Sequence, residues 1–247
     1  MPTIIQPTKS KRQCRVCFGF DVSKSNDYDG KIGAVNFAAR EVRDPLRDVA
    51  SKNPQMEMLI QIYEFGGSAR RHFASPVSPE DYQWTDVVAD GLTPFGSALK
   101  MMREDLESIP PETPCYAPAL IVVSDGMPND DWERQLEALN QTYWGRMSNR
   151  VAVAIGKDCD HSVLQRFLGS SELGILEATN ADQVVNAIVE ATLRASQASA
   201  AGSPPPAAPT NLAGEGGVSQ RSLLPEAPAD SIPPSILDNA SVENAQW

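Results

Sequence analysis

One short apolar run, from Ala119 to Ser124 (ALIVVS), sets the strongest limit on how this chain folds. It is the most apolar β-branched stretch of the sequence, and its residues do not alternate between polar and apolar. A strand of this kind is buried on both faces, as happens in a parallel sheet with helices on either side. The run therefore predicts a central parallel strand in an α/β protein.

The rest of the chain alternates between strand-like and helix-like patterns. Apolar runs predict strands at residues 15–20, 58–65 and 151–156, with edge strands around 70–74 and 174–177. Helical spacing predicts helices at 30–50, at 95–107, from about 130 to Tyr143, at 162–168 and at 181–195. Pro45 is expected to interrupt the first of these helices. Asn129 or Asp130 is expected to be the N-cap of the third. This alternation predicts a doubly wound, mostly parallel sheet with one antiparallel edge strand and helices on both faces.

The strand predicted at residues 15–20 runs directly into Asp21, Ser23 and Ser25. Side chains alternate along an extended segment, so these three are expected to face one way. One carboxylate and two hydroxyls are hard oxygen ligands, which suit a small divalent cation better than a soft metal. Thr93, before the helix predicted at 95–107, and Asp125, at the end of a second apolar strand, are two more candidates. In such a sheet, ligands bind beyond the carboxyl ends of the strands.

Each of these residues also has a purely structural interpretation. Ser23, Ser25 and Thr93 are common in turns and helix caps, and an aspartate before a glycine, as at Asp125, is a common turn former. Taken singly, each residue fits that interpretation well. Five suitable residues in this order together favour a metal site.

The order Asp-x-Ser-x-Ser, then a threonine between small residues, then an apolar strand ending in Asp-Gly resembles the metal-ion-dependent adhesion site of von Willebrand factor A domains. The resemblance covers residues 14–196. The phrases GLTPFGSAL (91–99) and SDGMPND (124–130) look most like the cytoplasmic bacterial branch associated with tellurium resistance. The resemblance implies the strand order 3-2-1-4-5-6, in which the strands ending at Asp21 and Ser124 are neighbours.

By this resemblance, the protein would hold Mg²⁺, or alternatively Mn²⁺ or Ca²⁺. Ser23 and Ser25 would bind the ion directly, Thr93 directly or through water, and Asp21 and Asp125 directly or by holding coordinated waters. Neutral hydroxyls leave the ion electron-poor, and octahedral coordination leaves one position for an anionic ligand. These residues are called the five predicted ligands below.

The function that the resemblance implies is a metal-dependent protein-protein interaction module, and not an enzyme. A partner protein would complete the coordination with a carboxylate or another anionic group. The tellurium-resistance branch implies a bacterial stress-response or phosphorylation signalling system, with a kinase or phosphatase of that system as a candidate partner.

Two other functions stay open at the level of the sequence. One is a Mg²⁺-dependent phosphatase with an aspartate nucleophile at a strand end, although Ser23 stands where that chemistry generally wants a second acid. The sequence has no phosphate loop of the Gly-x-x-x-x-Gly-Lys-Ser/Thr type. The other is a structural scaffold whose metal site stays unoccupied.

Two positions beside the predicted ligands depart from the usual pattern of the family. Lys24 stands where a glycine is usual, and Asn26 stands where a methionine is frequent. The Lys24 cation would either weaken metal binding or help to attract an anionic ligand. Asp27 and Asp29 also leave two interpretations open, a second cation site and a solvated acidic loop.

Charge and hydropathy argue against several classes of partner and location. The formal net charge of -11 argues against nucleic acid and anionic membranes, because binding to both depends on clustered Lys and Arg. Neither end carries an apolar segment that could span a bilayer, and residues 1–13 lack the apolar middle of a secretory signal, so we expect a cytoplasmic protein. Cys14 and Cys17 are expected on opposite faces of a strand, as structural thiols and not as a zinc or redox pair.

The sequence predicts four parts: an N-terminal arm (1–13), the von Willebrand factor A domain (14–196), an Ala/Pro/Gly linker (197–217) and a terminal segment (218–247). The linker is expected to be flexible, because its composition cannot bury enough apolar surface to offset its chain entropy. For residues 218–247, two interpretations stay open, a disordered tail and a docking segment. In the second, Glu226, Asp230 or Asp238 would offer a carboxylate to a metal site.

Overall fold

The computed structural model describes residues 11–27, 30–110, 112–125, 127–156, 159–169 and 174–201. They form a six-stranded sheet in the order β3-β2-β1-β4-β5-β6. The strands are β1 (Arg12–Asp21), β2 (Met56–Gly66), β3 (Ser68–Arg71), β4 (Ala119–Ser124), β5 (Asn149–Ile155) and β6 (Ile175–Ala178). Neighbouring strands are parallel, except that the edge strand β3 pairs antiparallel with β2. The predicted fold class, strand order and reversed edge strand are thus confirmed.

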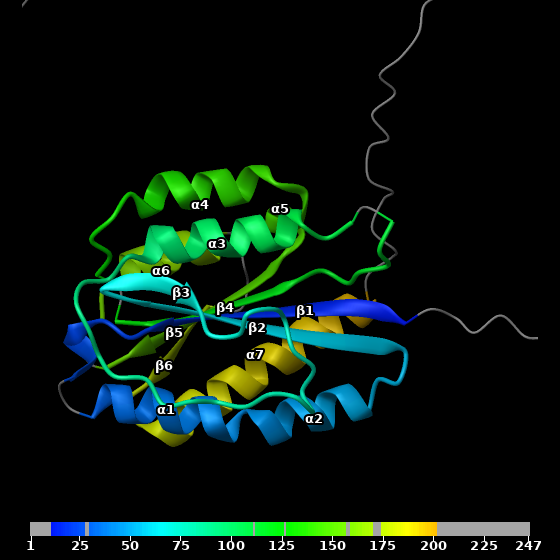
Figure 1. Ribbon diagram of the computed structural model, residues 1–247, viewed down its shortest axis with the longest axis horizontal. Coiled ribbons are helices and arrows are strands. Elements are labelled where there is room, and N and C mark those ends of the chain that lie inside the picture. The colour runs from blue at the N-terminus through cyan, green and yellow to red at the C-terminus, as the bar shows by residue number, and fades with distance from the viewer. Residues whose placement is uncertain are drawn as a thin grey trace, which may run out of the picture. The chain divides into compact units, whose positions relative to one another are not determined.

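Helices cover both faces of the sheet (Figure 1). On one face lie α1 (Lys31–Glu41), α2 (Arg43–Ser51) and α7 (Ala181–Ala201), and on the other lie α3 (Phe95–Glu107), α4 (Trp132–Gln141), α5 (Tyr143–Met147) and α6 (His161–Leu168). Buried side chains form two clusters, one on each face of the sheet. Every residue of β4 is buried, as its unbroken apolar run predicts for a strand covered on both sides.

The two cysteines of β1 show how the strand divides its side chains between the two cores. Cys14 belongs to one buried cluster and Cys17 to the other. Burial raises the pKa of both thiols to about 12, so both stay protonated at neutral pH. The prediction that they face opposite sides of the strand is confirmed.

Several element boundaries differ from the predicted ones. The interruption of the first helical segment falls at Val42, and Pro45 lies in the first turn of α2, where its missing N–H has no intrahelical partner to lose. The prediction that one helix carries Tyr143 is wrong, because Tyr143 begins the separate helix α5 after Thr142, whose side chain accepts a hydrogen bond from Gly145 N at 3.0 Å.

The prediction that Asn129 or Asp130 caps α4 is also wrong. The residue before α4 is Asp131, and its side chain makes no cap hydrogen bond. Asp130 instead accepts hydrogen bonds from the backbone N–H groups of Gly96 and Ser97, at 2.8 and 2.9 Å, in the first turn of α3. A helix that is distant in sequence therefore receives the cap.

Regular structure extends beyond the predicted limits of the domain. β1 begins at Arg12, and α7 continues to Ala201. Residues 1–10 and 202–247 lie outside the described residues, so the division into arm, linker and terminal segment stays a prediction. Within the described part of the chain, no helix is both long and apolar enough to cross a membrane.

Candidate metal centre

The serine loop, residues 21–27, follows the carboxyl end of β1. The strand ends at Asp21 and the chain turns into the short 3-10 helix η1 (Lys24–Asp27), so the expected extended conformation through Ser25 is wrong. The turn nevertheless gathers the three side chains. Ser23 N donates a hydrogen bond to Asp21 Oδ1 at 2.9 Å, and the hydroxyl oxygens of Ser23 and Ser25 lie 3.0 Å apart.

Asp21 is fully buried at the boundary between β1 and β4. Its Oδ2 accepts a hydrogen bond from the hydroxyl of Ser124, the last residue of β4, at 2.6 Å. Burial raises the pKa of Asp21 to about 6; hydrogen bonds from Ser124 and Ser23 oppose the rise, and the Asp125 charge adds to it. The two carboxylates are therefore close enough to repel each other, and a cation bound beside them would relieve that repulsion.

Asp125 follows β4 directly, and the whole residue is 6% exposed. Its Oδ2 lies 3.5 Å from Nζ of Lys31. Its Oδ1 is buried and has no hydrogen-bond partner among the residues that the structure describes. A buried carboxylate oxygen without a partner is costly, so this atom is a natural ligand for a cation.

Thr93 is buried and lies two residues before α3. Two backbone hydrogen bonds place its segment beside the other predicted ligands. Lys24 N in the serine loop donates to Gly91 O at 2.9 Å, and Asn129 N, in the segment after Asp125, donates to Thr93 O at 3.1 Å. The structure therefore brings the Thr93 segment to the same edge as the serine loop and Asp125.

Gly91 allows this close approach. Its φ is +55°, and a Cβ at this position would lie 2.4 Å from the Cα of Gly67, in the turn between β2 and β3. A side chain is excluded at that distance, and the positive φ favours glycine in any case. Gly67 N then donates to Leu92 O at 2.8 Å, and Asp90 N donates to Val22 O at 2.9 Å.

Hydrogen bonds therefore bring the segments of the five predicted ligands to the carboxyl end of β1. This end of the strand lies at the left of Figure 1. Two carboxylates and three hydroxyls are a donor set that suits a hard cation such as Mg²⁺. No group of three or more His, Cys, Asp or Glu side chains placed for a metal is found in the described part of the chain. Metal binding here would therefore depend on the hydroxyls as well as the carboxylates.

Sequence reasoning missed the contacts that three further residues make at this site. Ser124 orients Asp21, and Lys31 pairs with Asp125. Asn26 is fully buried, and its Nδ2 donates to the hydroxyl of Ser23 at 3.4 Å. Ser124 begins the phrase at 124–130 but was not predicted to contact Asp21, and Lys31 belongs to no phrase that the sequence singled out. Only the pairing of β1 with β4 and the position of α1 reveal their roles. Lys24, which the sequence singled out, is exposed.

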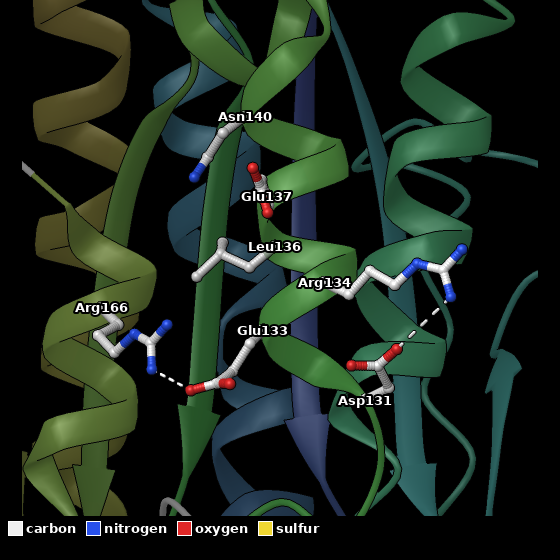
Figure 2. Close-up of a pocket in the computed structure, with 7 residues that line it drawn as sticks. All are labelled: Asp131, Glu133, Arg134, Leu136, Glu137, Asn140 and Arg166. Carbon is white, nitrogen blue, oxygen red and sulfur yellow. Dashed lines mark hydrogen bonds and ion pairs between the residues drawn. The ribbon is translucent and has the colours of Figure 1, made fainter.

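A separate polar groove of about 550 Å³ lies beside α4 and is closed on one side by Arg166 of α6 (Figure 2). Two ion pairs are among its lining residues: Arg166 pairs with Glu133, and Arg134 lies 3.8 Å from Asp131. None of the five predicted ligands lines this groove. The candidate metal centre is thus a different part of the surface.

No protein-family model matches the sequence, and no curated protein sequence matches it. Solved structures do match. A von Willebrand factor type A protein from Catenulispora acidiphila has a TM-score of 0.56 at 15% identity, over 75% of this chain and 43% of that one. The ArnB paralog VWA2 from Sulfolobus acidocaldarius has a TM-score of 0.53 at 16% identity, over 73% of this chain and 45% of that one.

The PilB minor pilin from Streptococcus sanguinis has a TM-score of 0.60 at 14% identity, over 80% of this chain and 65% of that one. This chain thus spans less than half the length of the first two matched structures. At these identities the comparisons show the fold. The chain has the α/β fold seen in von Willebrand factor type A structures.

Proposed function

We propose that this protein is a metal-dependent protein-protein interaction module. The five predicted ligands hold Mg²⁺, and an acidic group of a partner protein completes its coordination. The observation that carries the proposal is the Asp125 Oδ1 atom, buried without a partner among the described residues, at the edge where the other predicted ligands gather. A bound cation would give this oxygen the partner that it lacks among the described residues.

The protein's own side chains hold the site in shape. Hydrogen bonds from Ser23 and Ser124 fix both oxygens of Asp21. The hydroxyl groups of Ser23 and Ser25 lie close enough together to serve one ion. When bound, Mg²⁺ supplies a local positive charge on a protein with a net charge of -11, which favours an anionic ligand at this one place.

The surface around the site suits a protein partner. Val88, Leu92 and Met127 are 79%, 66% and 64% exposed. They flank Thr93 and Asp125 in the chain, and we call them the apolar rim. Exposed apolar side chains are typical of interaction surfaces when they lie beside a polar centre. We therefore expect a partner segment that carries a carboxylate next to apolar residues.

The enzyme alternative has less support. An aspartate nucleophile must reach the substrate, but Asp21 is fully buried with both oxygens in hydrogen bonds. The phrases at 91–99 and 124–130 support a role in a cytoplasmic bacterial stress-response or tellurium-resistance-type phosphorylation system. A kinase or phosphatase of that system is then the candidate partner.

Thermal melts test the metal site directly. A ligand that binds only the folded state raises the melting temperature, so Mg²⁺ at about a hundred times its Kd should raise that of the wild type by roughly 5–10 °C over chelator. Mn²⁺ and Ca²⁺ are tested in parallel. Asp125→Ala and the double variant Ser23→Ala/Ser25→Ala should lose the shift.

Asp48→Ala is the matched control, because Asp48 lies on α2 in an exposed ion pair with Lys52. This variant should keep the full metal-induced shift. A wild type whose melting temperature responds to none of the three ions contradicts the proposal. Mg²⁺-dependent hydrolysis of p-nitrophenyl phosphate that is lost in Asp21→Asn would instead support the phosphatase.

A further inference from the structure

Lys31, the first residue of α1, reaches from the neighbouring face of the sheet to the candidate metal centre. Its Nζ lies 3.5 Å from Asp125 Oδ2. Both side chains are mostly buried: the exposed fraction is 17% for the Lys31 side chain and 8% for the Asp125 side chain. Solvent therefore screens this ion pair much less than it screens a surface pair.

The backbone at the end of β5 makes room for the lysine. Gly156 has φ +86°, and a Cβ at this position would lie 2.7 Å from Cε of Lys31. The Lys31 stem thus lies directly over a glycine, in space that another residue would fill. By contrast, Lys24 is exposed, and none of the ion pairs found among the described residues involves it. The sheltered cation of this site is Lys31.

We propose that Lys31 is a built-in counter-cation that lowers the affinity of the site for Mg²⁺ and makes metal binding depend on an anionic ligand. This inference rests on the proposed function. A dication alone would balance the charges of Asp21 and Asp125. With the Lys31 ammonium also present, the loaded site carries a surplus positive charge, which a carboxylate of the partner would neutralise.

Two consequences follow from Coulomb repulsion between the ammonium and the dication. Removing the Lys31 charge strengthens Mg²⁺ binding, by about tenfold or more if a few ångströms of partly buried protein separate the two cations. An anion tightens Mg²⁺ binding more strongly when Lys31 is present than when it is absent, because only then is there a surplus charge to neutralise.

Calorimetric titration of the full chain with Mg²⁺ tests the first consequence. Lys31→Met and Lys31→Gln should bind Mg²⁺ about tenfold more tightly than the wild type, whereas Lys31→Arg should stay near the wild-type affinity. Lys52→Met, which removes the exposed lysine that follows α2, should leave the affinity unchanged. Thermal melts in chelator give a second reading: Lys31→Met should melt below the wild type, because Asp125 loses its counter-charge, and should gain more from Mg²⁺.

Repeating the titrations with sodium acetate in place of sodium chloride at equal ionic strength tests the second consequence. Acetate should tighten Mg²⁺ binding to the wild type more than to Lys31→Met. Equal Mg²⁺ affinities of the wild type and both neutral variants would overturn the inference and leave the proposed function intact. An equal effect of acetate on both proteins would overturn the dependence on an anion. If neither the wild type nor Lys31→Met bound any metal, the proposed function itself would fail.

Discussion

At the scale of single residues, the buried charge of Asp21 lowers the free energy of unfolding of the metal-free protein at neutral pH. It is fully buried beside a second carboxylate, and burial raises its pKa from 3.8 to about 6. The folded state therefore binds this proton more tightly than the unfolded state does. The stability that the proton provides is complete below about pH 4 and is lost as the pH rises through about 6.

Asp21→Asn should make the protein more stable in chelator at neutral pH, by up to about 3 kcal/mol, because the amide avoids the cost of a buried charge. The stability of the wild type should fall between about pH 4 and pH 6, and that of the variant should not. Urea denaturation at a series of pH values measures both effects, with Asp48→Asn as an exposed control. A variant less stable than the wild type at neutral pH would show that the hydrogen bonds to Asp21 outweigh its burial.

The sequence was enough to propose the five ligands, but it was not enough to predict their surroundings. Asp21, Ser23 and Asp125 stand out because a run of apolar residues ends just before them. The roles of Lys31 and Ser124 depend on contacts between elements that are far apart in the chain. No local pattern encodes such contacts, so only the folded structure identifies them.

At the scale of the elements, periodicity predicted strands and helices well, whereas caps and breaks depended on tertiary contacts. Unbroken apolar runs such as residues 119–124 indicate the central strands, because burial on both faces selects apolar residues at every position. Asp130 was assigned to the helix that follows it, yet its carboxylate caps α3 across the surface. The side chain of Asp130 thus caps α3, although α4 follows it directly in the sequence.

Replacing Asp130 by alanine should cost about 1–2 kcal/mol, because two backbone N–H groups of α3 lose their acceptor. Asp131→Ala is the matched control. The Asp131 side chain makes no cap hydrogen bond, and its ion pair with Arg134 is exposed. The change should therefore cost less than about 0.5 kcal/mol. Thermal or urea denaturation compares the two, and equal losses would contradict the assignment of the cap to Asp130.

At the scale of the whole molecule, the candidate metal centre lies at the carboxyl edge of the sheet, and Leu92 and Met127 of the apolar rim are one and two residues from Thr93 and Asp125 in the chain. The opposite edge also carries an exposed apolar residue, Met147, which is 40% exposed and ends α5 just before β5 begins. Met147 therefore lies away from the proposed recognition surface and supplies an internal control.

Leu92→Ser/Met127→Ser should leave both the stability and the Mg²⁺-induced melting shift within experimental error, because both side chains are exposed. Fluorescence anisotropy with two peptide pools that carry a central aspartate tests recognition. With Mg²⁺ present, the wild type and Met147→Ser should prefer the pool flanked by leucine and isoleucine over the pool flanked by serine and glutamine. The double variant should bind both pools alike; a preference that survives in it would exclude the apolar rim from recognition.

The loop that carries Thr93 is held in place by main-chain atoms of Asp90, Gly91 and Leu92. Apart from the glycine, these anchors do not depend on which side chains the loop displays. Val88 and Leu92 can therefore be exchanged without moving the threonine. Such a loop is a natural place to retune partner choice, because new contacts can be introduced there while the chemistry beneath stays fixed.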